Sequence, residues 1–259
     1  MILTAENYYS KEANREYMSV SQFKAFEECE YLGLSEVNGT YSRPSSVALL
    51  VGSYVDSHFD CSLDIFKAHH PELFKRDGGL KSDYVKAEQI IERIERDPMF
   101  MRYMSGEKQV IMTGVIEGIP VKIKMDSYHP GKMIVDLKIM RDFAPKYVSE
   151  CGKMNFIEAW RYDLQGAIYQ EIVYQNTGKR LPFVIAGATK EDVPDIALFQ
   201  VPQAYLDAQL EIFKANAPAY QLLKQGITEP IRCEHCDACK ATKVLNKITP
   251  WEELQGYVG

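Results

Sequence analysis

The stretch MDSYHPGKMIVDLKI, residues 125–139, decides the fold. Two β-rich runs meet at a turn near Gly131, so we expect a hairpin in which Asp126 and Asp136 lie roughly opposite each other. Because side chains alternate along a strand, Asp136 and Lys138 share one face, and Val135 and Leu137 face the core. The pattern predicts two carboxylates and an ammonium that converge on one patch.

Two opposed carboxylates repel each other, and a divalent cation removes that penalty. Mg²⁺ and Mn²⁺ prefer oxygen ligands of this kind, and such an ion can activate water and stabilise charge on a phosphate. The alternative for the D-x-K triplet alone is a surface salt bridge between Asp136 and Lys138, which is the commoner use of such a pair.

Outward from the hairpin, apolar spacing predicts helices before it and alternating strands and helices after it. We expect helices over 19–37, 45–70, 82–104 (with a break at Pro98), 155–178 (ending at Gly178) and 202–226, and strands over 108–118, 119–128, 132–140, 181–190 and 195–201. This order predicts an α/β (α+β) fold with a mixed central β-sheet flanked by helices. We expect one domain over 1–259, made of a helical part (1–105), a core (106–201), and a helix with a cysteine-rich tail (202–259).

Composition limits the classes of function. The chain has 259 residues with 46% hydrophobic and 25% charged residues, as in ordinary globular proteins. The net charge of −6 means that any contact with nucleic acid depends on a local basic surface. The start of the chain lacks a signal-peptide pattern, and no apolar run is long enough for a membrane span, so we expect a cytoplasmic protein without a membrane partner.

The six cysteines include a C-x-x-C-x-x-C run at Cys233, Cys236 and Cys239. Disulfides are rare in the cytoplasm, and this spacing is typical of metal or cluster ligation. His235 is an alternative ligand for zinc. Cys61 and Cys151 are expected to be incidental thiols.

The hairpin with D-x-K resembles the core of the PD-(D/E)xK nuclease superfamily, and YDLQGAIYQ resembles the Q-x-x-x-Y helix of its RecB-type branch. The stretch LLVGSYVDSHF resembles the G-x-x-x-H helix of that branch, except that Asp56 stands four residues after Gly52 and His58 follows two residues later. A carboxylate at Asp56 could replace the histidine ligand, and His58 is then a core or surface residue. The resemblance implies catalytic roles for Asp126, Asp136, Lys138, Gln165 and Tyr169; metal ligation by Asp56, Asp126, Asp136 and the Leu137 carbonyl; and DNA contacts from Tyr162, Gln165 and Tyr169.

The stretch SVSQFKAFEECEYLGL resembles the N-terminal helix of the iron–sulfur nucleases of this superfamily, the AddB-like and CRISPR-adaptation enzymes. That resemblance implies a site made by Cys29 together with Cys233, Cys236 and Cys239. Their second cysteine gap is usually longer than the one here. Four thiolates suit either a [4Fe–4S] cluster, which the resemblance favours, or Zn²⁺. The simpler alternative is that Cys29 is a buried helix residue and only the three tail cysteines bind metal.

Over about residues 19–243, the order of motifs resembles the phage-type exonucleases related to exonuclease VIII (RecE). The resemblance implies a deoxyribonuclease that acts at double-stranded DNA ends and makes single strands for an annealing protein of the RecT type; oligomers are known among such enzymes. Lysines expected to line its cleft are Lys122, Lys124, Lys146 and Lys153. The alternatives are a DNA-binding scaffold that has lost its chemistry, and an endonuclease of CRISPR adaptation or restriction.

Overall fold

The centre of the molecule is a five-stranded mixed β-sheet in a computed structural model that describes residues 1–148 and 151–251. The strand order is β1-β2-β3-β6-β7, with only the β3–β6 pair parallel. The strands are β1 (Glu107–Ile116), β2 (Ile119–His129), β3 (Met133–Met140), β6 (Phe183–Thr189) and β7 (Ile196–Gln200). The expected fold class is confirmed; residues 252–259 of the expected tail lie outside the described part.

The hairpin between β2 and β3 has the predicted register. Ser127 pairs with Val135 and His129 with Met133, and Gly131 occupies the turn at φ +69°, where glycine is favoured. The regular pairing begins at Ser127 and does not reach Asp126. The two strands therefore stop sharing a ladder where their aspartates lie.

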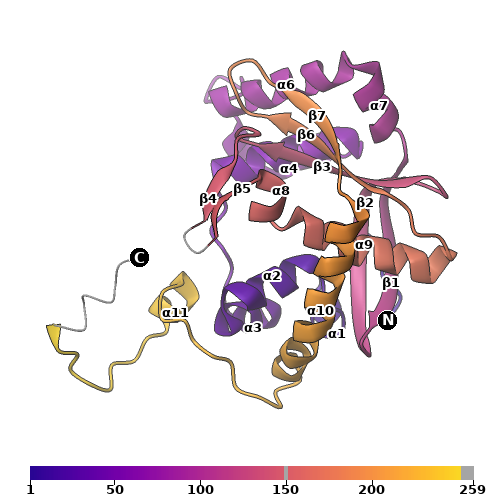
Figure 1. Cartoon of the computed structure of the whole chain (residues 1–259). Coiled ribbons are helices and arrows are strands. Elements are labelled where there is room, and N and C mark those ends of the chain that lie inside the picture. The colour runs from indigo at the N-terminus through magenta and orange to yellow at the C-terminus, as the bar shows by residue number, and fades with distance from the viewer. Residues whose placement is uncertain (149–150, 252–259) are drawn as a thin grey trace.

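Helices cover both faces of the sheet (Figure 1). One face packs against α4 (Val47–Phe59), α6 (Ser82–Glu95) and α7 (Pro98–Met104), with Val135 and Leu137 in the shared core. The other face packs against α2 (Val20–Glu28), α9 (Tyr162–Thr177) and α10 (Gln203–Lys224), with Ile134 in that core. The alternation of β3 between the two cores places Asp136 and Lys138 on the α9 side.

The remaining helices are short, and β4 and β5 form a separate two-stranded sheet. These elements are α1 (Lys11–Glu16), α3 (Glu30–Asn38), α5 (Leu63–His69), η1 (Pro71–Leu73), β4 (Lys146–Val148), β5 (Gly152–Met154), α8 (Phe156–Ala159) and α11 (Asp237–Ala241). The sequence pattern did not predict α1, the β4–β5 pair or α11, because each is too short to establish a period.

Three predicted helices are interrupted, and this corrects the sequence-based boundaries. The helix expected over 19–37 breaks at Cys29, whose backbone is extended at φ −167°. The helix expected over 45–70 ends at Phe59, before Cys61 at φ +63°. The helix expected over 155–178 is divided by Arg161 in the left-handed region at φ +55°. The break at Pro98 and the end at Gly178 are as predicted.

Across residues 1–148 and 151–251, none of the helices combines the length and the apolar character that crossing a membrane requires.

Candidate active site

A cleft of about 420 Å³ brings the predicted site residues together. Its lining includes Asp56, Asp126, Asp136, Leu137, Lys138, Gln165 and Tyr169. These residues come from one helix on each side of the sheet, α4 and α9, and from β2 and β3 between them. The cleft lies where the β2–β3 pairing has ended, and polar side chains from both strands line the space between them.

Asp126 is tied to the neighbouring strand by its own carboxylate. Its Oδ2 accepts a hydrogen bond from the backbone N–H of Leu137 at 3.0 Å. Burial, reinforced by the nearby Asp136 carboxylate, raises the pKa of Asp126 to about 7. The fold therefore holds a carboxylate whose negative charge is costly without a compensating cation.

Asp136 is 2% exposed and has two side-chain partners. Its Oδ1 accepts a hydrogen bond from Gln165 Nε2 at 2.6 Å, and its Oδ2 lies 2.5 Å from Lys138 Nζ. Burial alone would lower the pKa of Lys138, but the Asp136 and Asp126 carboxylates outweigh it and raise that pKa. The Asp136–Lys138 ion pair thus exists, but it lies inside the cleft and not on the surface.

Asp56 completes the acidic group from α4. Its Oδ1 is buried and has no hydrogen-bond partner among residues 1–148 and 151–251, and burial followed by repulsion from Asp126 raises its pKa well above the ordinary value. A buried carboxylate oxygen without a donor suits a cation ligand. The three carboxylates form an oxygen-rich donor set of the kind that Mg²⁺ or Mn²⁺ takes, so the residues fit such an ion.

His58 is directed away from this group. Its Nε2 lies 2.8 Å from Glu95 on α6, and its side chain is 31% exposed. The helix period explains the difference, because residues two apart do not share a helix face, whereas Gly52 and Asp56 do. Of the two residues in the altered motif, only Asp56 lies in the cleft.

Two residues of α9, Gln165 and Tyr169, hold parts of the site in place through hydrogen bonds. Gln165 holds Asp136, and the Tyr169 hydroxyl donates to the Lys124 carbonyl at 3.0 Å. Both side chains are mostly buried. Tyr162 lies more openly, with Lys138 Nζ 5.2 Å and Lys24 Nζ 5.4 Å from its ring centroid.

The four lysines expected along the cleft have different surroundings. Lys122 and Lys124 both line the cleft, but Lys122 is 1% exposed and its ammonium donates to Tyr8 O and to Asn14 Oδ1 at 2.8 Å. Lys146 pairs with Asp142 at 2.9 Å, and Lys153 is exposed on β5. Neither Lys122 nor Lys124 has a carboxylate partner among the described residues, but only Lys124 is partly exposed, with its ammonium beside the rings of Tyr8 and Tyr9.

Several cleft residues from the N-terminal segment were not predicted from the sequence: Tyr8, Tyr9, Ser21 and Lys24. Ser19 caps α2 by accepting from Gln22 N–H, which begins the helix at the cleft and leads Ser21 and Lys24 into it. No local period marks these positions. The only available signal was a lysine in the second turn of a helix with a serine cap, Lys24 five residues after Ser19.

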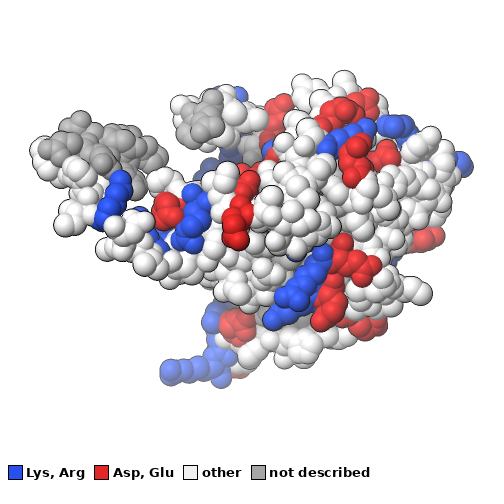
Figure 2. All heavy atoms as spheres, turned by 90° about the horizontal axis from the view of Figure 1, so that it is seen from below, with Lys and Arg blue, Asp and Glu red and all other residues white. Residues whose placement is uncertain are grey.

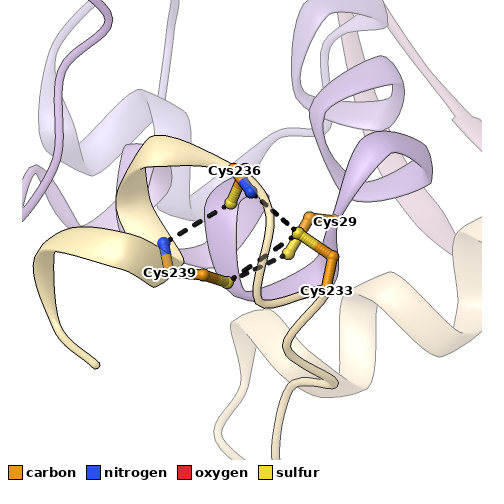
Figure 3. Close-up of side chains that lie close together, drawn as sticks. All are labelled: Cys29, Cys233, Cys236 and Cys239. Carbon is orange, nitrogen blue, oxygen red and sulfur yellow. Dashed lines mark hydrogen bonds between the residues drawn. The ribbon is translucent and has the colours of Figure 1, made fainter. Parts of the chain in front are cut away.

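The second polar site joins α3 to the C-terminal tail. Figure 3 shows the side chains of Cys29, Cys233, Cys236 and Cys239 close together. Their sulfur atoms all lie within 4.8 Å of one another. Cys29 and Cys239 Sγ are 3.7 Å apart, and Cys233 and Cys239 Sγ are 4.0 Å apart. The chain thus brings together all four of the cysteines expected to bind metal.

Backbone N–H groups surround two of these sulfur atoms. Cys233 Sγ accepts from the N–H of His235 at 3.4 Å and of Cys236 at 3.2 Å, and Cys236 Sγ accepts from the N–H of Cys239 at 3.5 Å. Such N–H donors stabilise thiolates, which are the form that binds metal. Cys61 and Cys151 are exposed and separate from this group.

Charge is not concentrated on the face seen in Figure 2, where Lys and Arg alternate with Asp and Glu. With 30 basic and 36 acidic residues in the chain, no general attraction for nucleic acid is expected.

Comparison with known proteins gives a family and one strong structural relative. A family described as "PDDEXK-like domain of unknown function (DUF3799)" matches residues 19–242. A crystal structure of a protein from Eubacterium rectale, described as a "Putative exonuclease", is 51% identical over 100% of both chains, with a TM-score of 0.96. The crystal structure of SSO0001 is 13% identical over 77% of this chain and 88% of that one, with a TM-score of 0.26, which carries no argument. A search of curated proteins gives no match.

Proposed function

The chain belongs to the PDDEXK-like family DUF3799, and we propose that within this nuclease family it is a deoxyribonuclease that depends on Mg²⁺ or Mn²⁺. The observation that carries the proposal is the meeting of Asp56, Asp126 and Asp136 with Lys138 in one cleft. Two of these carboxylates have raised pKa values, and one buried oxygen has no donor. A structural ion pair alone explains neither feature.

The roles of the side chains follow from their contacts. Asp56, Asp126 and Asp136 would hold the cation, with the Leu137 carbonyl as a further ligand. Gln165 fixes the orientation of Asp136, and the Leu137 N–H fixes that of Asp126. When bound, the cation supplies Lewis-acid stabilisation for the phosphate and a more acidic water.

Lys138 is the cation that the chain itself provides. Because neighbouring carboxylates raise its pKa, it stays protonated at neutral pH. A protonated ammonium at this point can orient the attacking water and stabilise negative charge on the phosphate. Tyr162, which is partly exposed, would contact the DNA, while Gln165 and Tyr169 would steady the site through Asp136 and the Lys124 carbonyl.

We also propose that the enzyme digests from the ends of double-stranded DNA. The relative described as a "Putative exonuclease" supports an end-directed activity. The order of motifs supports a role in phage-type recombination, in which the single strand passes to an annealing protein of the RecT type. A cytoplasmic location suits that role.

The test is digestion of linear and closed circular duplex DNA by the purified protein with Mn²⁺. We expect the linear DNA to be degraded and the circles to remain intact. Asp136→Asn and Lys138→Met should each reduce the rate at least about 10³-fold, since each removes a charge that acts in the transition state. Binding of DNA without degradation would instead indicate a scaffold, and cleavage of circles would indicate an endonuclease.

For the four-cysteine site we propose one Zn²⁺ ion. Sulfur atoms around a single tetrahedral zinc, with bonds of about 2.3 Å, lie about 3.8 Å apart, and Cys29 and Cys239 Sγ are 3.7 Å apart. The thiolates of a cubane cluster bind four separate irons and are farther from one another. The 4.8 Å limit on all sulfur separations therefore supports zinc over [4Fe–4S].

Elemental analysis and absorbance of anaerobically purified protein decide between them. We expect about one zinc per chain and a colourless solution. A brown protein that absorbs near about 400 nm, as iron–sulfur clusters do, would contradict zinc.

A further inference from the structure

The N-terminal segment places an exposed aromatic ring on the wall of the cleft. Tyr9 is 69% exposed and lines the cleft together with Lys124. The ring of Tyr8 packs edge-on against that of Tyr9, with centroids 4.9 Å apart and an interplanar angle of 84°. Tyr8 itself is only 6% exposed, so it anchors the exposed ring.

Buried hydrogen bonds fix this segment to the sheet. Lys122 Nζ donates to Tyr8 O and Asn14 Oδ1, and Met18 bridges to β2 through Met18 N to Pro120 O at 2.8 Å. A rigid exposed ring loses little conformational entropy when a ligand stacks on it. The segment is thus built to present Tyr9 and not merely to cover the core.

Lys124 provides a charge beside that ring. Its Nζ lies 4.7 Å from the Tyr9 centroid and 5.6 Å from the Tyr8 centroid. Lys124 is two residues before Asp126 on β2, so both side chains face the cleft. Among the described residues, no carboxylate pairs with Lys124, and none pairs with Lys24 on the α2 side, which donates to Trp160 O at 2.8 Å.

Two aromatic rings near the acidic group therefore each lie beside a lysine: Tyr9 beside Lys124, and Tyr162 beside Lys24. Aromatic rings interleaved with cations are typical of sites for single-stranded nucleic acid, where bases stack and ammonium groups contact phosphates. A volume of about 420 Å³ is that of a small-ligand pocket, a size that suits a single nucleotide.

We propose that Tyr9 and Lys124 form a subsite for one unpaired nucleotide of the DNA strand, with its base on the Tyr9 ring and its phosphate at Lys124. This subsite rests on the proposed nuclease function and specifies its substrate as a separated strand end. A duplex must fray before the strand enters the cleft, and Lys24 contacts another phosphate of that strand.

The test measures binding of a labelled single-stranded oligonucleotide by fluorescence anisotropy, with Ca²⁺ in place of Mg²⁺ so that binding is separated from cleavage. Tyr9→Ala should weaken binding about 5- to 100-fold, as loss of one base stack does, and Tyr9→Phe should bind nearly as the native protein. Tyr174→Ala is the matched control, because Tyr174 is an exposed tyrosine beside Arg180 that lies outside the cleft.

An abasic nucleotide placed in turn along the oligonucleotide identifies the stacked base. At one position the abasic site should weaken binding to the native protein and to Tyr9→Phe but not to Tyr9→Ala. Lys124→Gln should lower the slope of log affinity against log salt by about 0.7, and Lys153→Gln on the exposed face of β5 should leave it unchanged.

Equal affinities of Tyr9→Ala and the native protein, or the same abasic profile for both, would overturn the subsite. Because binding is measured without cleavage, Tyr9-dependent binding by a protein that never degrades DNA would refute the nuclease proposal and leave the subsite standing. Degradation with no dependence on Tyr9 would refute only the subsite.

Discussion

Three carboxylates in one cleft are a source of instability in the absence of a cation. The pKa of Asp126 is raised to about 7 by burial and by Asp136, from the ordinary value of 3.8. A group with a raised pKa in the folded state costs stability once it ionises, so this cost appears as the pH rises from about 4 to about 7. A cation held by the three carboxylates would relieve this cost.

Asp126→Asn should therefore stabilise the metal-free protein. The amide oxygen can still accept from Leu137 N–H, while the negative charge is gone. In EDTA we expect a gain in unfolding free energy of roughly 1–3 kcal/mol at pH 8, allowing for the partial exposure of the carboxylate, and almost no gain at pH 4. Urea unfolding at the two pH values measures it.

The same variant should lose the stabilisation that Mn²⁺ gives to the native protein, because one ligand is missing. If Asp126→Asn raises the unfolding free energy equally at pH 4 and pH 8, the raised pKa of Asp126 is not the cause of the gain. If it is less stable at pH 8, the Leu137 contact and not the charge dominates.

Gln165 acts through Asp136. Its amide donates to Asp136 Oδ1 at 2.6 Å, so Gln165→Leu leaves that oxygen free to turn away from the cation. We expect a 10- to 100-fold loss of activity or of Mn²⁺ affinity, about the usual effect of removing a residue that orients a metal ligand. Titration of activity with Mn²⁺ measures it.

Gln170→Leu is the matched control, because Gln170 is a buried glutamine on the same helix whose amide donates to Leu181 O at 2.8 Å. It should alter stability but not the Mn²⁺ requirement. An identical Mn²⁺ curve for Gln165→Leu and the native protein would show that Asp136 is held without Gln165.

Helix α9 positions the site because it packs tightly against the sheet and α10. A Cβ atom on Gly166 would lie 2.5 Å from Phe183 Cδ1 and 2.9 Å from Leu206 Cδ2, closer than real contacts permit. The glycine at this point lets the helix approach β6, and the approach brings Gln165 to Asp136.

Gly166→Ala should lower the unfolding free energy by about 1–3 kcal/mol, as overpacking does. Gly52→Ala on α4 has no atom within 4 Å of the new Cβ and should raise stability by up to about 1 kcal/mol through helix propensity. Chemical denaturation of both variants measures the contrast. A neutral Gly166→Ala would mean that α9 can move away without cost.

The four cysteines connect the N-terminal helices to the C-terminal tail. Cys29 lies between α2 and α3, while the other three lie in the tail near α11, about 200 residues later along the chain. A metal across so long a loop restricts the unfolded chain strongly. Since α2 also carries Ser21 and Lys24 to the cleft, a metal bound by the four cysteines would stabilise one wall of the cleft.

Cys29→Ser should abolish the bound metal and lower the melting temperature by at least about 5 °C, since 1 kcal/mol shifts a domain of this size by about 2–4 °C. Cys151→Ser, an exposed cysteine outside the group, should change neither. Elemental analysis and thermal unfolding measure both. Full metal content in Cys29→Ser would restrict the site to the three tail cysteines.

The sequence pattern was sufficient to predict those features that depend only on residues close together in the chain. Alternation along residues 132–140 predicted which side of β3 carries Asp136 and Lys138, and the turn at Gly131 predicted the register of the hairpin. Helix spacing predicted that Gln165 and Tyr169 share a face of α9. The cysteine spacing predicted a metal site in the tail. These features depend on neighbours within a few residues, whose geometry the backbone period fixes.

The remaining features depended on packing between distant parts of the chain. Pattern alone does not reveal that α4 brings Asp56 to the hairpin, that Lys122 is buried while Lys124 is not, or that Tyr9 stands beside the cleft. Nor does it reveal the breaks at Cys29 and Arg161, where tertiary contacts override helix propensity. The sequence pattern therefore determines each helix and strand locally. Which site residues come into contact is decided by the faces of the sheet against which the helices pack.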